Sequence, residues 1–374
     1  IVCAAGLSAA QATLQPLVTQ DSFEGAVLGK KVWIDNLEAF GNEFDNGSGN
    51  VALTFTRSSE ANRTGTLNGN RGIRKKNSGP LLDLGTLPGA TDTWVFGMSA
   101  DGKAIVGLSL LPDREGAFRW TQGAGMIDLG MLPGGTVGAS AYGASNNGAV
   151  VVGASDSANG IHAYRWTTNT GMVDLGVLPG GSYSFGLAVS ANGHTITGFA
   201  DLTGGAEHAF RWTPQHGMQD LGAVNPDEWS SGYAISANGA VIAGTSGADA
   251  ARWVNGTPQS LGHLDGGSFS GAYGVNENGL FIVGTSDDES GDLRAFLWTP
   301  LLGMVDLNDL LPTLGVDLTN WTLEAATSIS ADGRRIVGVG LIGGARRGFI
   351  ATLPNPGLCG EGWLPGCGHH HHHH

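Results

Sequence analysis

A short motif that returns along the chain constrains the fold more than any other feature of the sequence. It reads GMIDLG at residues 125–130, GMVDLG at 171–176, GMQDLG at 217–222 and GMVDLN at 303–308. Its aspartate, or Ser260 in the aspartate's place, recurs at steps of about 40 to 46 residues between positions 83 and 306. A period of this length is typical of repeat architectures, in which each copy is one supersecondary unit.

Two other motifs keep the same register. An aromatic run precedes the hexapeptide and ends at Trp120, Trp166, Trp212, Trp253 and Trp298, with a degenerate last copy, GFIA, at 348–351. A turn motif precedes each run as SADG, SNNG, SANG, SANG, NENG and SADG, beginning at residues 99, 145, 190, 236, 276 and 330. These three anchors define six copies of one repeat.

Each copy contains four strand-like pieces. In the second copy they are residues 140–145, 149–155, 162–167 and 172–178, and Asn147-Gly148 between the first two suits a tight hairpin. Four short strands in about 45 residues is the spacing of a propeller blade, whereas a helical solenoid would show a 3.6-residue period. The sequence therefore predicts an all-β propeller.

The side chains also predict the order of the strands and the closure of the ring. The first strand of each copy carries small residues that suit a crowded centre, namely Gly97, Gly143, Ala188, Ala234, Gly274 and Ser328. The DLG strand is then outermost, and the last copy ends near Pro354 without one. We therefore expect a six-bladed β-propeller over residues 81–354, closed by residues 81–85. Seven blades are the alternative, because three roles are open to residues 13–80: they form a partial seventh blade, cap the channel or remain disordered.

The hexapeptide itself is predicted to be scaffold. Its aspartate is expected to pair with the arginine of the neighbouring aromatic run, at Arg119, Arg165, Arg211 or Arg252, because buried polar groups need partners. An enzyme does not need its catalytic carboxylate in every blade. Function is therefore sought where the copies differ.

The charge of the chain limits its partners. The formal net charge is −14, and most of the acidic excess lies beyond residue 80. A nucleic-acid partner requires a basic footprint and is excluded, whereas calcium is compatible with an acidic surface. No stretch is long and apolar enough to span a membrane, and we expect a monomer.

The ends of the chain indicate export. Residues 1–12, IVCAAGLSAAQA, look like the end of a signal peptide with an Ala-x-Ala cleavage site. Cys359 and Cys367 lie in the tail 355–368 and are placed to form a disulfide in an exported protein. Residues 369–374 are a histidine tag. The expected location is secreted, periplasmic or cell surface.

The copies resemble the extracellular repeats of the HAF family, named for His-Ala-Phe. EHAFRWT at 207–213, GMVDLGVLPGGSYS at 171–184 and the SANG turns carry the resemblance, which covers residues 81–354. The triplet is literal only at 208–210 and nearly so at 162–164. Other copies place Gly116, Asp249, Arg294 and Arg347 in the histidine slot. The resemblance implies a propeller-like, exported protein and implies no particular reaction.

Candidate binding residues lie on the loops that enter the inner strands, at one mouth of the predicted channel. In one slot the copies read Thr93, Ala139, Ser184, Ser230, Ser270 and Glu324. The predicted ligand-binding residues are Ser184, Ser230 and Ser270 with Trp94, Trp229 and Trp321. The predicted calcium ligands are Asp92, Asp227, Asp265 and Glu324, because ligation by oxygen alone favours calcium over zinc.

Candidate catalytic residues are the carboxylates Glu228 and Glu324 and the possible bases His162 and His208. The chain contains no Gly-x-Ser-x-Gly elbow and no His-Glu-x-x-His motif. The first hypothesis is an exported module that binds a small molecule, a carbohydrate or a protein. A calcium-dependent hydrolase of lactones or esters is the alternative by analogy of fold, and a propeller glycosidase is the third.

Overall fold

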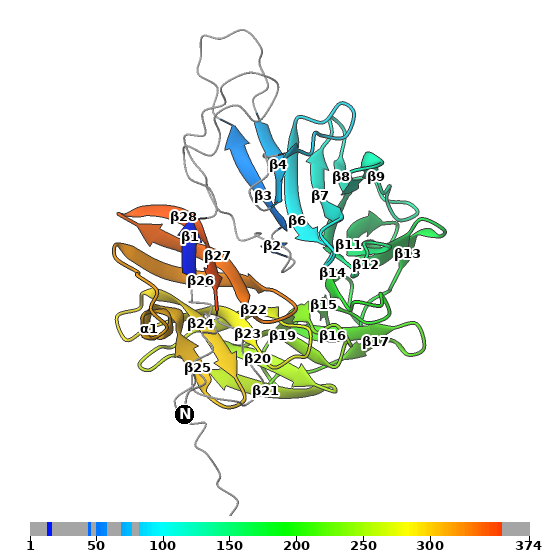
Figure 1. Ribbon diagram of the computed structural model, residues 1–374. Coiled ribbons are helices and arrows are strands. Elements are labelled where there is room, and N and C mark those ends of the chain that lie inside the picture. Colours follow the sequence, from blue (N-terminus) through cyan, green and yellow to red (C-terminus); the bar gives the residue numbers. More distant parts are fainter. Residues whose placement is uncertain (1–12, 17–43, 46–49, 58–68, 77–81, 354–374) are drawn as a thin grey trace, which may run out of the picture.

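The computed structural model describes residues 13–16, 44–45, 50–57, 69–76 and 82–353, and its side chains are described over 82–353. These residues form seven antiparallel sheets of four strands each, arranged as blades around a common axis (Figure 1). The prediction of a β-propeller is confirmed. The predicted signal-peptide remnant and the cysteine-containing tail lie outside the described residues.

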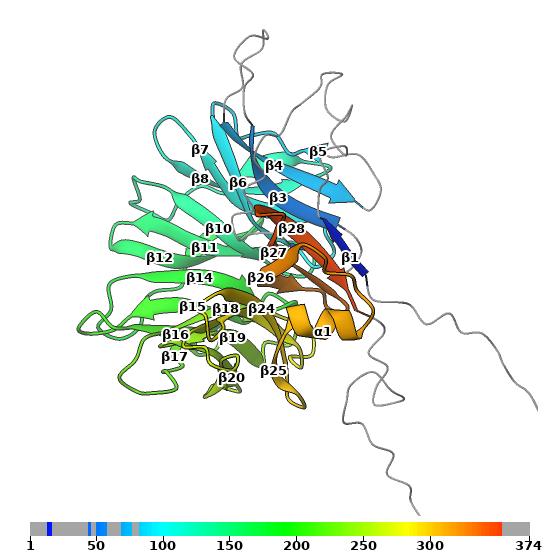
Figure 2. The same cartoon turned by 90° about the vertical axis from the view of Figure 1, so that its left-hand side faces the viewer.

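Six of the sheets correspond to the six sequence repeats, and in each the strands of the repeat itself follow chain order from the centre of the ring outward. The strands are β6 (Asp92–Met98), β7 (Ala104–Leu110), β8 (Glu115–Thr121) and β9 (Gly125–Asp128); β10 (Ala139–Ala144), β11 (Val150–Ser157), β12 (Gly160–Thr167) and β13 (Gly171–Asp174); β14 (Ser184–Val189), β15 (Ile196–Asp201), β16 (Glu207–Thr213) and β17 (Gly217–Asp220); β18 (Ser230–Ile235), β19 (Val241–Ser246), β20 (Asp249–Val254) and β21 (Thr257–Gly262); β22 (Ser270–Val275), β23 (Ile282–Asp287), β24 (Leu293–Thr299) and β25 (Gly303–Asp306); and β26 (Trp321–Ile329), β27 (Arg335–Ile342) and β28 (Ala345–Thr352). A short helix, α1 (Leu307–Thr313), follows β25 (Figure 2).

The seventh sheet comes from the segment that precedes the repeats. It contains β2 (Phe44–Asp45), β3 (Asn50–Arg57), β4 (Gly69–Lys76) and β5 (Leu82–Asp83), and it contacts β6 on one side and β26 and β27 on the other. This segment therefore forms the further blade that the alternative included. Apart from the DLG motif at β5, its sequence lacks the repeat motifs, and so the repeat alone could not reveal it.

The ring closes differently from the prediction. Leu82 and Asp83 pair with β4 of their own sheet, so residues 81–85 do not complete the last blade. The outer strand of that blade is β1 (Thr13–Pro16), which pairs antiparallel with β28. Strands from both ends of the chain thus share one sheet, and β28 has no open edge there.

The first strand of each repeat blade lies innermost, as its small side chains predict. A Cβ added at Gly97 would clash with the carbonyl oxygen of Tyr142 in the next blade. A Cβ at Gly143 would lie 2.9 Å from the carbonyl oxygen of Leu187. Adjacent inner strands therefore approach too closely for larger side chains at these positions.

The turns that follow the inner strands are joined into a belt. The backbone N–H of Asn146 donates to the carbonyl of Ala191, and the chain of bonds continues to Ala237, Glu277 and Ala331 with lengths of 3.0 to 3.2 Å. We call this end of the propeller the hairpin face. The opposite end, where loops lead into the inner strands and join the second to the third strands, is the loop face.

The hydrophobic core lies between neighbouring blades. The leucine of the DLG motif is buried in all six copies, at Leu84, Leu129, Leu175, Leu221, Leu261 and Leu307. The methionines of the hexapeptide pack against the same clusters. Gly171 and Gly176, which begin and end one hexapeptide, have φ angles of 65° and 76°, a region that glycine adopts without strain. The motif is scaffold, as predicted.

Candidate functional site on the loop face

The repeated aspartate has a partner other than the predicted arginine. His162 Nδ1 lies 2.8 Å from Asp174 Oδ2, and His208 Nδ1 lies 2.9 Å from Asp220 Oδ1. Because the strand register pairs Tyr164 with Asp174, the histidine two residues earlier lies diagonally across from the carboxylate on the same face. The histidine slot, rather than the arginine slot, therefore faces the aspartate.

The arginines make contacts elsewhere. Arg119 Nε donates to the carbonyl of Gly148 at 2.7 Å, and Arg165 Nε donates to that of Gly193 at 3.2 Å. Both acceptors lie in hairpin turns of the following blade. The prediction of an Asp–Arg pair in every blade is wrong, because these arginines connect adjacent blades.

The candidate bases His162 and His208 do not form one site. They lie on β12 and β16 of adjacent blades, and each is engaged by the aspartate of its own blade. Their residue exposures are only 7% and 9%. A buried histidine that pairs with an aspartate of the neighbouring strand has a structural role. The geometry gives it no access to a substrate.

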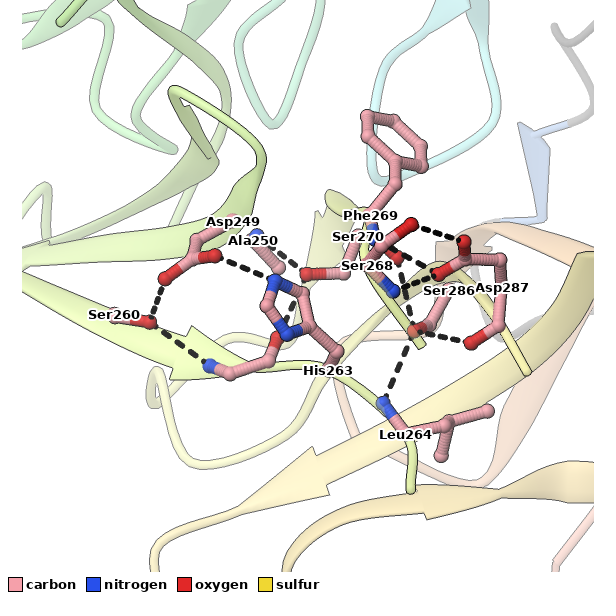
Figure 3. Close-up of polar contacts among 11 residues, drawn as sticks. Asp249, Ala250, Ser260, His263, Leu264, Ser268, Phe269, Ser270, Ser286 and Asp287 are labelled. Atoms are coloured by element: carbon pink, nitrogen blue, oxygen red, sulfur yellow. Dashed lines mark hydrogen bonds and ion pairs between the residues drawn. The ribbon is translucent and has the colours of Figure 1, made fainter. Parts of the chain in front are cut away.

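The blade of β18–β21 exchanges the positions of the same groups (Figure 3). Asp249 occupies the histidine slot, Ser260 the aspartate slot, and His263 follows the outer strand. His263 Nε2 lies 2.6 Å from Asp249 Oδ1, and Ser260 Oγ donates to Asp249 Oδ2 at 2.5 Å. Since the carboxylate stands between the serine and the imidazole, the histidine does not activate the serine as a nucleophile.

The three predicted ligand-binding serines are structural. Ser230 Oγ donates to the carbonyl of Gly222 at 2.7 Å and accepts the backbone N–H of Ala209 at 2.9 Å. Ser184 and Ser270 make the corresponding pairs of bonds, and all three side chains are fully buried. Each hydroxyl connects an inner strand to the preceding blade and is not available to a ligand.

Glu324 does not occupy the serine slot. A β-bulge in β26 places Leu323 opposite Gly340 and Ala325 opposite Val339, so Glu324 is the extra residue. Its carboxylate accepts Arg346 Nε at 3.0 Å. The sequence alignment missed the bulge because it assumed one spacing for every copy.

The predicted metal ligands Asp92, Asp227, Asp265 and Glu324 are distributed over four blades. Within residues 82–353 no group of three or more His, Cys, Asp or Glu side chains is close enough to hold a metal ion. Glu228 is also on a different blade from Glu324, and its carboxylate packs over Gly247. The described residues therefore bring together neither the calcium set nor the carboxylate pair.

Aspartates at the ends of second strands shape the loop face. Asp287 Oδ1 accepts the backbone N–H groups of Ser268 and Phe269 at 2.7 and 2.8 Å (Figure 3). Asp201 holds Ser182 and Tyr183 in the same way, and Asp156 holds Thr136 and Val137. The backbone bonds lower the pKa of Asp156 and Asp287 below the ordinary value. Each carboxylate fixes the loop that leads into its inner strand.

These fixed loops present a row of apolar side chains, which we call the apolar arc: Val137, Tyr183, Trp229 and Phe269. They stand at corresponding positions in four successive blades. Val137 is 66% exposed, Trp229 43% and Phe269 37%, and the Phe269 ring points away from the Asp287 carboxylate (Figure 3). Of the three predicted tryptophans, only Trp229 is exposed, since Trp94 and Trp321 are half-buried.

The third loop of the arc, which carries Trp229, is held in a different way. Gly247 stands where other blades have the capping aspartate, and its N–H donates to the Trp229 carbonyl at 2.8 Å. The Glu228 carboxylate covers Gly247 so closely that a Cβ there would clash with it. This copy thus differs from its neighbours while still presenting an aromatic side chain.

Further apolar and acidic side chains surround the arc. Leu110, Ile161 and Leu293 are 40% to 43% exposed at strand ends on this face. With Val137, Trp229 and Phe269, they make up six of the ten exposed large hydrophobic side chains found within residues 82–353. Asp288, Glu289 and Asp292 extend the acidic border beside Phe269. The loop face therefore carries exposed apolar side chains together with acidic ones, of which Asp288 and Asp292 pair with Arg294.

Neither a protein-family profile nor the sequence of a curated protein matches this chain, and the resemblance to HAF repeats stays a prediction. Solved structures are similar at low identity. An oligogalacturonate lyase of Vibrio parahaemolyticus matches with a TM-score of 0.53 and 9% identity, over 92% of this chain and 97% of that one. An oligogalacturonate lyase in complex with manganese matches with 0.51 and 12%, over 84% and 88%.

A third structure, a puromycin-hydrolyzing peptidase of Mycobacterium tuberculosis, matches with a TM-score of 0.51 and 16% identity. The match covers 88% of this chain and 52% of the peptidase, so this chain corresponds to about half of that protein. At such identities the similarity shows the propeller fold alone. No helix in the described ranges has the length and apolar character needed to cross a bilayer.

Proposed function

We propose that this protein is an exported, non-catalytic interaction module that binds a partner protein through the apolar arc. The observation that carries the proposal is the exposure of Val137, Trp229 and Phe269 at corresponding places in three of the four successive blades of the arc. Protein interfaces are enriched in aromatic side chains at their centre and polar at their rim. An arc that extends over four blades is too broad for one small ligand.

The charge of the loop face selects the kind of partner. Asp156, Asp201 and Asp287 border the arc, and the whole chain carries a net charge of −14. Complementary charge increases the rate of association and excludes wrong partners. The partner is therefore a protein with an apolar centre surrounded by basic residues, and the complex weakens as salt concentration rises.

Export is part of the proposal and rests on the sequence of residues 1–12 and on the expected pairing of Cys359 and Cys367 near the end of the chain. It is tested by expressing the chain with its native leader and assaying the culture medium, the periplasm and the cytoplasm. Recovery only from the cytoplasm would contradict it.

The interaction is tested by site-specific photo-crosslinking in the native host. A photoreactive phenylalanine analogue at position 269 or 229 should give one discrete crosslinked protein. The matched control places the analogue at Leu301, which is 61% exposed in a turn on the hairpin face. Trp229→Ala should reduce the yield from position 269, and higher salt should do the same.

Three results would contradict the proposal. They are equal crosslinking from Leu301, a yield from position 269 that Trp229→Ala does not change, and the absence of a discrete product from both loop-face positions. Binding confined to the hairpin face would instead move the interaction site to the other end of the propeller.

A further inference from the structure

The structure contains a pocket at the opposite end of the propeller, on its axis at the hairpin face. Its volume is about 270 Å³, which corresponds to roughly nine water molecules. Residues from six blades line it, so it belongs to the ring as a whole. It lies away from the apolar arc, and nothing in the proposed function uses it.

Two tiers of side chains form the wall. The upper tier consists of the last residues of the inner strands: Met98, Ala144, Val189, Ile235, Val275 and Ile329. The lower tier consists of the second residue of each turn motif: Ala100, Asn146, Ala191, Ala237, Glu277 and Ala331. The upper tier is entirely apolar, and the described lining residues include no lysine, arginine or histidine.

Glu277 makes this pocket different from a plain apolar hollow. Four of the six copies have alanine at the corresponding position and one has Asn146, so the carboxylate is not required by the turn. Its hydrogen bonds within the described residues are made by its backbone, which donates to the carbonyl of Ala331 and accepts the N–H of Ala237. The backbone is thus fixed on both sides, and the residue is exposed and lines the pocket.

We propose that the axial pocket binds a small organic cation, an ammonium group attached to an apolar chain. The apolar tier accommodates the chain because burial of hydrocarbon surface is favourable. Glu277 supplies the counter-charge, and no basic lining residue competes for it. The volume is below the range that holds drug-sized molecules, which fits a ligand with few heavy atoms.

The proposal is tested with three probes of equal chain length: hexylammonium, hexanol and hexanoate. Binding to the full chain is measured by ligand-observed NMR and calorimetry at pH 7. Hexylammonium should bind saturably and about fivefold more tightly than hexanol, as expected for a partly exposed charge pair. Hexanoate should bind more weakly than hexanol.

Two variants of the pocket and one control make the test specific. Glu277→Gln should lower the affinity for hexylammonium about fivefold without changing that for hexanol. Glu277→Ala should do the same, and the turn tolerates it because four other copies carry alanine. The control is Asp332→Asn, which removes the same charge from a nearby turn where the side chain is bonded to Ser330 and Arg334.

Each alternative outcome overturns the proposal. The absence of saturable hexylammonium binding would exclude the site. Equal affinities for hexylammonium and hexanol would exclude the role of the charge. A loss of affinity in Asp332→Asn as large as that in Glu277→Gln would show a diffuse surface effect rather than a counter-ion in the pocket.

Discussion

The imidazole of His162 and the carboxylate of Asp174 lie 2.8 Å apart and join the third and fourth strands of one blade. His208 and Asp220 repeat the relationship in the next blade. The histidine of the His-Ala-Phe triplet and the aspartate of the hexapeptide are therefore two halves of one structural contact. The aspartate also recurs in blades that lack this histidine, so the pairing accounts for the two motifs in these two blades.

This contact predicts a coupled loss of stability. His162→Ala and Asp174→Ala should each lower the free energy of unfolding by about 1–2 kcal/mol, since the pair is partly buried and the aspartate also accepts the Gly176 N–H. The double variant should cost less than the sum of the two. Urea unfolding at pH 7 measures all three. Asp113→Ala, an exposed aspartate, is the control, and additive losses would contradict the pairing.

The buried serines predict a larger local effect. Ser230→Ala leaves the carbonyl of Gly222 and the N–H of Ala209 without their partner inside the fold. The expected loss is about 1–3 kcal/mol. The exposed Ser290→Ala should change the free energy of unfolding by less than about 0.5 kcal/mol. A loss in Ser230→Ala no larger than in this control would contradict the structural role and reopen the ligand-binding interpretation.

Much of the fold could be predicted because the repeat is regular. The turn motifs, the small residues at Gly97 and Gly143 and the DLG leucines each report a constraint that recurs in every blade. The seventh blade could be predicted only as an alternative, and the β1 closure could not be predicted, because residues 13–80 carry none of the anchors. Strand pairing over such distances depends on the rest of the ring rather than on local sequence.

The site was harder to predict, because the position of each side chain in its sheet depends on how the neighbouring strands pair. Equal spacing of the motifs aligns Glu324 with Ser184. Glu324, however, is the bulged residue of β26 and has no paired residue in β27. The serines are candidates because they are small and lie near the channel. The structure shows that they are buried and that their hydroxyl groups bond to backbone groups. The apolar arc had a signal that the sequence analysis did not use: a large apolar residue stands beside the serine slot at Tyr183, Trp229 and Phe269.

The aspartates of the loop face predict how stability depends on pH. Hydrogen bonds from Thr136 and Phe269 lower the pKa of Asp156 and Asp287. In Asp201 burial raises the pKa, but bonds from Tyr183 and Ser182 outweigh it and the net pKa is lowered. A lowered folded pKa gives stability that is complete above the unfolded value near 4 and lost as pH falls through the folded value. The Tm should therefore fall below about pH 4.

Asp306 provides a comparison of opposite sign. Burial raises the pKa of this carboxyl, which caps α1 by accepting the Asn308 N–H. Its ionisation above pH 4 therefore costs stability, whereas ionisation of Asp201 adds to it. Relative to the unmodified chain, the Tm of Asp306→Asn should rise between pH 4 and 7, and that of Asp201→Asn should fall as the pH rises towards about 4. Parallel changes in the two variants, measured by calorimetry, would contradict the assignment.

The pairing of β1 with β28 predicts that the first seventeen residues contribute to the stability of a blade at the other end of the sequence. Removal of residues 1–17 deletes the strand Thr13–Pro16 and exposes the edge of β28. The free energy of unfolding should fall by at least about 2 kcal/mol, because the hydrogen bonds of four paired residues are lost. The open edge should also promote concentration-dependent association, seen by size-exclusion chromatography. Removal of residues 1–12 leaves the strand intact and is the matched control. If the two truncated chains unfold at the same temperature and elute alike, β1 does not close the ring.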